Sequence, residues 1–113
     1  MPNSVELLQG TLDMLIMNAV SLGPLHGYGT LLRIQQISKS ALQIPQGSLY
    51  PALYRLECKG WIASEWGESE NRRKAKYYRL TAKGKKQLRS ETGQWNRLND
   101  AISSVLNARP EEV

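Results

Sequence analysis

The densest concentration of charge in the sequence lies in ENRRKAKYYRL, residues 70–80. Two tyrosines, Tyr77 and Tyr78, stand there among five basic side chains: Arg72, Arg73, Lys74, Lys76 and Arg79. Residues 72–89 hold nine Lys or Arg and no Asp or Glu, whereas residues 1–60 carry four basic and three acidic side chains. A solvated face is the ordinary explanation of a charge run. Its concentration in one window of a chain with a net charge of +5 favours a polyanionic partner instead.

Other kinds of chemistry find little support in the sequence. His26 is the only histidine and Cys58 the only cysteine, which excludes an intrachain disulfide and disfavours a zinc site. We recognise no phosphate-cradling glycine loop and no pair of carboxylates on one predicted face. We therefore expect neither an enzyme nor a bound cofactor or metal. The absence of a signal peptide and of a membrane-spanning apolar run indicates a reducing, cytoplasmic setting.

Helices precede the basic window. Residues 6–21 have the periodicity of an amphipathic helix that ends before Gly23-Pro24, and a second helix opens at Gly27. A third helix is predicted over residues 48–60, with Ser48 as its N-cap and Pro51 in its first turn. Its apolar stripe should face the core, and its opposite face should carry Ser48, Tyr54 and Arg55, with Tyr50 on the flank.

The period then changes to two. WIASEW (residues 61–66) and AKYYRLT (residues 75–81) predict a β-hairpin in which Tyr78 faces inward. Thr81 caps a last helix that runs to about Leu106. The expected fold class is mainly α with a small β-hairpin, that is, a winged helix-turn-helix followed by a C-terminal dimerisation helix. We place the DNA-binding domain at residues 1–81, the dimerisation helix at 82–107 and a frayed tail at 108–113.

The last helix carries an apolar seam without an obvious partner in the chain. Leu88, Trp95 and Ile102 are seven residues apart, and Leu98 and Val105 take the interleaved positions. We therefore expect this helix to pair with a second chain. Association with a membrane surface is poorly supported, because residues 82–89 offer little apolar surface beyond Leu88.

In a winged helix-turn-helix the third helix enters the major groove of DNA, and the loop of the hairpin lies along the backbone or reaches into the minor groove. We predict that four side chains of this loop pair with phosphates: Arg72, Arg73, Lys74 and Lys76. Two other classes stay open. An RNA-binding module would use the interleaved tyrosines, although a two-stranded hairpin offers a small platform. A protein-interaction dimer without a nucleic-acid role would leave the nine basic residues unexplained.

Three motifs, GPLHGYG, GSLYPALYRLECKGWI and KYYRLTAKGKKQL, occur in an order that resembles the PadR family of bacterial transcriptional regulators. The resemblance runs from Leu8 to about Leu106 and is to the compact members with one C-terminal helix. It implies a homodimeric repressor that binds a palindromic operator, although activation stays open. It also implies that the C-terminal helix packs on the partner's N-terminal helix, so Leu8 and Leu12 join the expected interface.

The resemblance also implies roles for single residues. The candidate contacts from the recognition helix to DNA are Ser48, Tyr50, Tyr54 and Arg55. Of these, Arg55 alone can make a bidentate contact to guanine. It could instead pair with a neighbouring acid or with a phosphate. Glu57, near the inward stripe, is predicted to be a structural ion-pair partner.

The resemblance further suggests an effector site. In some compact relatives an aromatic residue of the C-terminal helix stacks on planar drugs, and Trp95 is similarly placed. Asn99 and Asp100 lie one turn away as possible polar contacts for a small planar or phenolic effector. The alternative is that Trp95 is an ordinary aromatic of a dimer core. His26 resembles the histidine of the family's HGY turn, where we expect a structural role.

Overall fold

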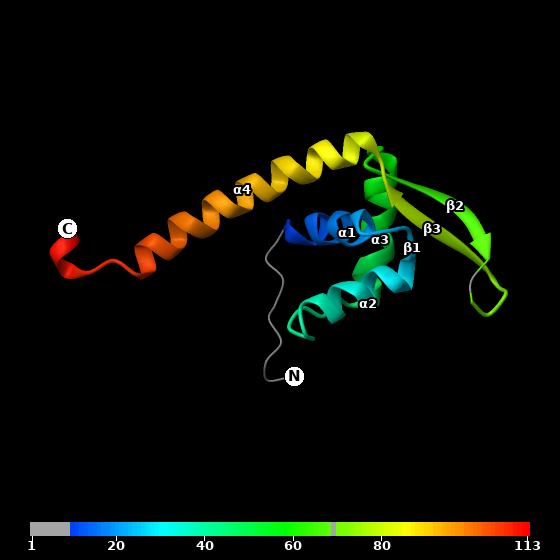
Figure 1. Ribbon diagram of the computed structural model, residues 1–113, viewed down its shortest axis with the longest axis horizontal. Helices are drawn as coiled ribbons and strands as arrows, with labels where there is room; N and C mark the ends of the chain where they lie inside the picture. The colour runs from blue at the N-terminus through cyan, green and yellow to red at the C-terminus, as the bar shows by residue number, and fades with distance from the viewer. Residues whose placement is uncertain (1–9, 69) are drawn as a thin grey trace.

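The computed structural model describes residues 10–68 and 70–113 of the chain. Its elements are α1 (Thr11–Ser21), β1 (Leu25–His26), α2 (Gly27–Ile37), α3 (Gln46–Cys58), β2 (Ile62–Glu68), β3 (Lys74–Leu80), α4 (Ala82–Leu106) and a short 3-10 turn (Pro110–Glu112). Figure 1 shows the first three helices gathered together, with the hairpin of β2 and β3 projecting on one side and α4 extending away on the other. This arrangement confirms the predicted winged helix-turn-helix with an added C-terminal helix. Among the described residues, no helix is both long and apolar enough to cross a membrane.

The sheet contains one strand more than the sequence predicted. Its order is β1-β3-β2, and both pairs of strands are antiparallel. β1 pairs Leu25 with Tyr78 and His26 with Tyr77. Two residues are too few to show an alternating pattern, so sequence periodicity missed this strand. The added strand ties the start of α2 to the middle of the hairpin.

The core lies between α1, α3 and the inner face of the sheet. The predicted apolar stripe of α3 is buried, and Tyr78 is buried on β3 as expected. The buried apolar residues are Ile16, Met17, Ala19, Val20, Ile34, Ile44, Leu49, Ala52, Leu53, Leu56, Ile62 and Tyr78. Burial also raises the pKa of the Tyr78 hydroxyl above its ordinary value. The hairpin is therefore fixed to the helices by its base, and its far end extends past them.

Two predicted helix starts are wrong. α1 begins at Thr11 because Gly10 has a φ of 89°, in the left-handed region that ends a right-handed helix. Leu8, expected at a dimer interface, lies outside the described residues. α3 begins at Gln46, directly after Pro45, and its N-terminus has no side-chain cap. Ser48 therefore lies inside the first turn and is not the cap.

Thr81 caps α4, as predicted. Its hydroxyl accepts a hydrogen bond from the Gly84 amide at 2.9 Å and lies 2.7 Å and 3.0 Å from the carbonyl oxygens of Gly60 and Trp61, to which it can donate. The first half of α4 then packs on α1, so the expectation that the helix has no partner within the chain is wrong for this half. In the tail that we expected to be frayed, Arg109 is paired with Glu112 at 3.1 Å.

Candidate nucleic-acid interface

The outward face of α3 carries the four side chains that we predicted to contact DNA. Ser48, Tyr50, Tyr54 and Arg55 are all exposed, and Tyr54 is the most exposed aromatic residue of the four at 72%. A hydrogen bond between Tyr54 and Cys58, one turn further along, raises the pKa of the Tyr54 hydroxyl. The helix thus presents a row of polar groups on the side opposite its buried stripe.

Arg55 is held by an acid of α1. Its Nη2 lies 2.5 Å from Oδ1 of Asp13, and its Nε lies 3.4 Å from Oδ2 of the same residue. This paired arrangement raises the pKa of the Arg55 guanidinium further above its already high value. The structure therefore shows the ion pair that the sequence left as one alternative for Arg55. The guanidinium is still about half exposed, so its position on the outer face is fixed without being covered.

Glu57 links the recognition helix to the wing, as predicted. It accepts a hydrogen bond from the Ser64 hydroxyl of β2. Its other carboxylate oxygen lies 3.6 Å from the ammonium group of Lys76 on β3. Lys76, which we predicted to bind phosphate, is thus drawn toward α3 and lies between the helix and the hairpin.

The tip of the wing carries the remaining basic side chains. Arg72, Arg73 and Lys74 are exposed, and Arg72 has a φ of 59°, so the loop turns through the left-handed region there. Near the tip, the Tyr77 hydroxyl donates a hydrogen bond to the carbonyl oxygen of Glu68 at 3.1 Å. Figure 1 shows this loop at the end of the hairpin furthest from the helices.

A cleft of about 770 Å³ separates the wing from the helices. The helical side is formed by the start of α2 and by Tyr50 of α3, and the other side by the wing. Its lining residues are His26, Gly27, Tyr28, Tyr50, Trp66, Asn71, Arg73, Lys74, Ala75, Lys76 and Tyr78. Three of these are basic and none is acidic, so the cleft suits an anion or a polyanion.

His26 and Gly27 explain the shape of the helical side of this cleft. The imidazole Nδ1 of His26 accepts the amide hydrogen of Gly29 at 3.0 Å, which caps α2 and confirms the structural role that we expected. A Cβ at Gly27 would lie 2.9 Å from the ring of Tyr50. Glycine at position 27 therefore lets α2 approach α3 closely enough to hold the Tyr50 ring at the edge of the cleft.

The architecture and the sequence converge on one family. Residues 16–90, from α1 into the first turns of α4, match the model of the transcriptional regulator PadR-like family. The chain belongs to this family. Its members are transcriptional regulators rather than enzymes, and the protein is accordingly a PadR-like transcriptional regulator.

Solved structures of similar proteins agree with this assignment. A PadR family transcriptional regulator from Eggerthella lenta is 33% identical, with a TM-score of 0.74 over 89% of this chain and 86% of that chain. A transcriptional regulator from Clostridium thermocellum is 28% identical, with a TM-score of 0.77 over 85% and 93% of the two chains. A PadR-like transcriptional regulator from Bacillus cereus is 25% identical, with a TM-score of 0.78 over 90% and 97%.

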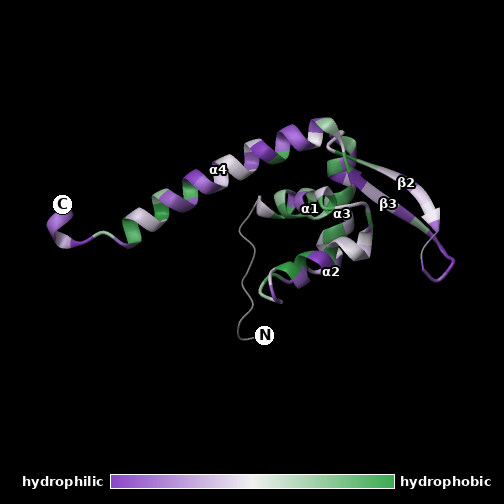
Figure 2. Ribbon diagram, in the orientation of Figure 1, coloured by the Kyte–Doolittle hydropathy of each residue, from purple (hydrophilic) through white to green (hydrophobic). Residues whose placement is uncertain are grey.

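The predicted dimerisation residues of the PadR-like protein fall into two groups. Leu12 and Leu88 are partly buried against the chain's own core. Leu98, Ile102 and Val105 are exposed on the second half of α4, where Val105 reaches 75%. Figure 2 shows green, hydrophobic segments recurring along this half of the helix. The apolar surface that is left for another chain therefore begins near Leu98.

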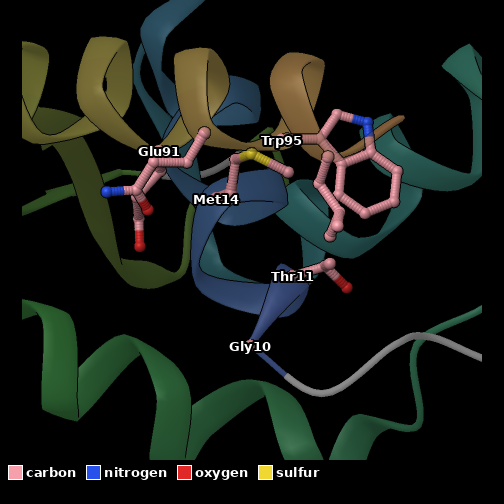
Figure 3. Close-up of a pocket in the computed structure, with 7 residues that line it drawn as sticks. Gly10, Thr11, Met14, Glu91 and Trp95 are labelled. Atoms are coloured by element: carbon pink, nitrogen blue, oxygen red, sulfur yellow. The ribbon is translucent and has the colours of Figure 1, made fainter. Parts of the chain in front are cut away.

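Trp95 lies between these two groups, beside a second cavity of about 230 Å³ between α1 and α4. Figure 3 shows Met14 between Glu91 and Trp95, with Thr11 below the indole ring. Gln94 and Leu98 complete the lining on α4. Asn99 and Asp100, predicted as polar contacts of an effector, do not line this cavity. The acidic group beside Trp95 is Glu91 instead.

Glu91 was missed at the sequence stage of the reasoning because a charged residue in an exposed helix has no distinctive pattern. Its Oε2 atom is buried and has no hydrogen-bond partner among the described residues. Burial raises the pKa of the Glu91 carboxyl, and the negative charge of Asp13 raises it further. Asp13 was also missed, although a charge inside the otherwise apolar run of α1 was a visible signal.

Proposed function

We propose that this PadR-like protein is a homodimeric repressor that binds a palindromic operator in double-stranded DNA. The cleft between the recognition helix and the wing is the observation that carries the proposal. Its basic wing wall, with Arg73, Lys74 and Lys76, suits the sugar–phosphate strand that separates a major groove from the adjacent minor groove. The exposed face of α3 then enters the major groove.

The proposed contacts divide by chemistry. On the wing, Arg72, Arg73, Lys74 and Lys76 bind phosphates and give affinity without sequence preference. On α3, Ser48, Tyr50 and Tyr54 donate hydroxyl hydrogen bonds to phosphates or base edges. Arg55 reads a guanine through the part of its guanidinium that Asp13 leaves exposed. Asp13 would then orient Arg55 in advance, which reduces the conformational entropy lost on binding.

The dimer is proposed from the exposed second half of α4. Leu98, Ile102 and Val105 recur at spacings of four and three, as in a helix that packs along another helix. Two copies joined in this way would place their α3 helices in successive major grooves, about 10 base pairs or a multiple apart. A palindromic operator follows from the twofold symmetry of such a dimer.

The cavity beside Trp95 supports a proposed regulatory site. Its volume of about 230 Å³ is below the range of about 300–1,000 Å³ that is common for small-molecule pockets. A second copy packed on α4 would enlarge and close it. A planar or phenolic effector would stack on Trp95, and release of DNA would follow if the effector favoured a different spacing of the two wings.

The proposal is tested with labelled duplexes that the purified protein selects from a random library. We expect these duplexes to bind at least about tenfold more tightly than unselected duplex, since specific sites exceed non-specific DNA by larger factors. With about 6–10 phosphate contacts per dimer, affinity should fall by about 10³–10⁵ between 50 and 200 mM salt.

The competing functions give different outcomes in the same assay. Tighter binding of single-stranded RNA than of any duplex would favour the RNA-binding module. No binding of any nucleic acid at low salt would contradict the proposal and leave a protein-interaction dimer. Arg72→Ala serves as an internal standard, because it should weaken binding to all duplexes alike and reduce the salt slope by about 1.

A further inference from the structure

Trp66 of β2 has an environment unlike that of the other two tryptophans. Its side chain is 68% exposed, whereas Trp61 and Trp95 are both partly buried. Trp61 is also covered by the ammonium group of Lys59, 4.7 Å from its ring centroid. One exposed apolar side chain is ordinary on a protein surface. The position of Trp66 is what makes it informative.

Trp66 lies on the face of the hairpin that looks toward the helices. It is directly opposite Lys76 in the β2–β3 register, and the next pairs along the same face are Ser64–Tyr78 and Ile62–Leu80. Tyr78 and Ile62 are buried in the core, so the same face that seals the core at its base carries the indole at its far end. The helices end before they reach it.

Trp66 also borders two hollows at once. It closes the wing end of the 770 Å³ cleft, and it lines a smaller hollow of about 430 Å³ together with Gly67, Glu68, Arg72 and Lys74. Three basic side chains from these hollows, Arg72, Arg73 and Lys74, come from the adjoining loop. An aromatic ring set among cations on a concave surface is the arrangement that nucleic-acid-binding proteins use for sugar and base contacts.

We propose that Trp66 is a DNA-contacting residue, which packs its indole ring against deoxyribose at the minor-groove side of the phosphate strand seated in the cleft. The inference rests on the proposed function. If α3 occupies the major groove, the backbone strand crosses the cleft, and the wing end of the cleft meets the adjacent minor groove. Apolar side chains at such positions pack on sugars or wedge between base steps. The surrounding cations hold the phosphates on either side.

This contact has a signature that separates it from the basic residues. Trp66 has no charge, so its removal should lower affinity without changing the number of counterions released. Removal of Lys74 should instead flatten the dependence of affinity on salt. The two substitutions therefore differ in a slope as well as in a binding constant.

The test compares Trp66→Thr with the wild type by anisotropy of the selected duplex and of an unselected duplex. Threonine keeps a high strand propensity, so the hairpin should form and the thermal midpoint should not move. We expect Trp66→Thr to bind both duplexes roughly tenfold more weakly with an unchanged salt slope. Ile37→Thr, an exposed apolar residue at the far end of α2 and outside the cleft, is the matched control and should bind as the wild type does.

Fluorescence gives a second measurement. Duplex binding should quench the wild-type tryptophan emission, and most of that quenching should be absent in Trp66→Thr. Affinity of Trp66→Thr within about twofold of the wild type would overturn the inference, even with duplex binding intact. An equal loss on single strands would overturn it as well. Failure of the wild type itself to bind duplex would instead remove the proposed function.

Discussion

Gly84 lies where the wing, the third helix and α4 meet. It is the one buried residue of α4, and a Cβ built on it would fall 1.9 Å from the carbonyl oxygen of Trp61 and 2.7 Å from Cδ1 of Leu80. Both distances are well inside van der Waals contact, and the closer one is to backbone. The substitution Gly84→Ala therefore forces α4 away from the end of α3 or distorts the chain at Trp61.

Either movement has a cost that can be estimated. The Trp61 carbonyl accepts hydrogen bonds from the amide of Thr81 at 3.1 Å and from its hydroxyl at 3.0 Å. Weakening these bonds costs about 1 kcal/mol each. Overpacking a filled site costs typically about 1–3 kcal/mol, and alanine returns about 1 kcal/mol of helix propensity. We expect Gly84→Ala to lower the free energy of unfolding by about 2 kcal/mol, or the melting temperature by about 8 °C.

Gly93 provides the matched control on the same helix. A Cβ there would meet only Nη1 of Arg97 at 3.5 Å, the far end of a flexible side chain. Gly93→Ala should therefore stabilise the protein by about 1 kcal/mol through helix propensity alone. Thermal unfolding followed by circular dichroism, with chemical denaturation to give free energies, measures both variants against the wild type.

The two variants should move in opposite directions. Equal stability of Gly84→Ala and the wild type would show that α4 does not approach Trp61 closely, and the stated geometry of the wing would be wrong. Destabilisation by Gly93→Ala, with a concentration-dependent midpoint, would show that a second chain packs against α4 at this residue.

Three further predictions concern the proposed function. Arg55→Ala should cost about 1–3 kcal/mol on the selected duplex and relax the preference at one base pair, measured by competition between duplexes; equal losses on random DNA would show that Arg55 reads no base. Leu98→Asp should give monomers in sedimentation, and a persisting dimer would remove this part of α4 from the interface. Glu91→Gln should stabilise the protein above the ordinary carboxyl pKa of about 4.3, with a gain that grows as pH rises through the raised pKa of folded Glu91 and is absent in acid. Thermal midpoints that differ equally at all pH values would contradict the last prediction.

Local patterns were sufficient for the parts of the structure that depend on nearby residues. The cap at Thr81, the buried stripe of α3 and the inward Tyr78 each follow from periodicity or from a side chain three residues from its partner. The structural role of Glu57 also followed from its place near the stripe. Because these features repeat throughout winged helices, the fold and the family could be predicted from the sequence.

Features that depend on distant residues could not be predicted in this way. Asp13 and Arg55 are 42 positions apart, and nothing in the local sequence of either residue indicates the ion pair. Trp66 continues the alternation of its strand, and only the end of the helices above it decides that it is exposed. Gly84 looked like a weak point of its helix because the Trp61 carbonyl that requires it comes from another element.

α1 brings the recognition helix and the cavity beside Trp95 into contact with consecutive residues. Asp13 holds Arg55, and the next residue, Met14, lines the cavity with Glu91 and Trp95. An effector or second chain that moved α1 against α4 would therefore act on the carboxylate that orients Arg55. Such coupling requires that the effector bind two arrangements of α1 with different affinities. Under the proposed function, Asp13→Asn should leave effector binding at Trp95 measurable while reducing the effector's influence on DNA affinity, and an undiminished influence would show that the signal passes through the spacing of the wings instead.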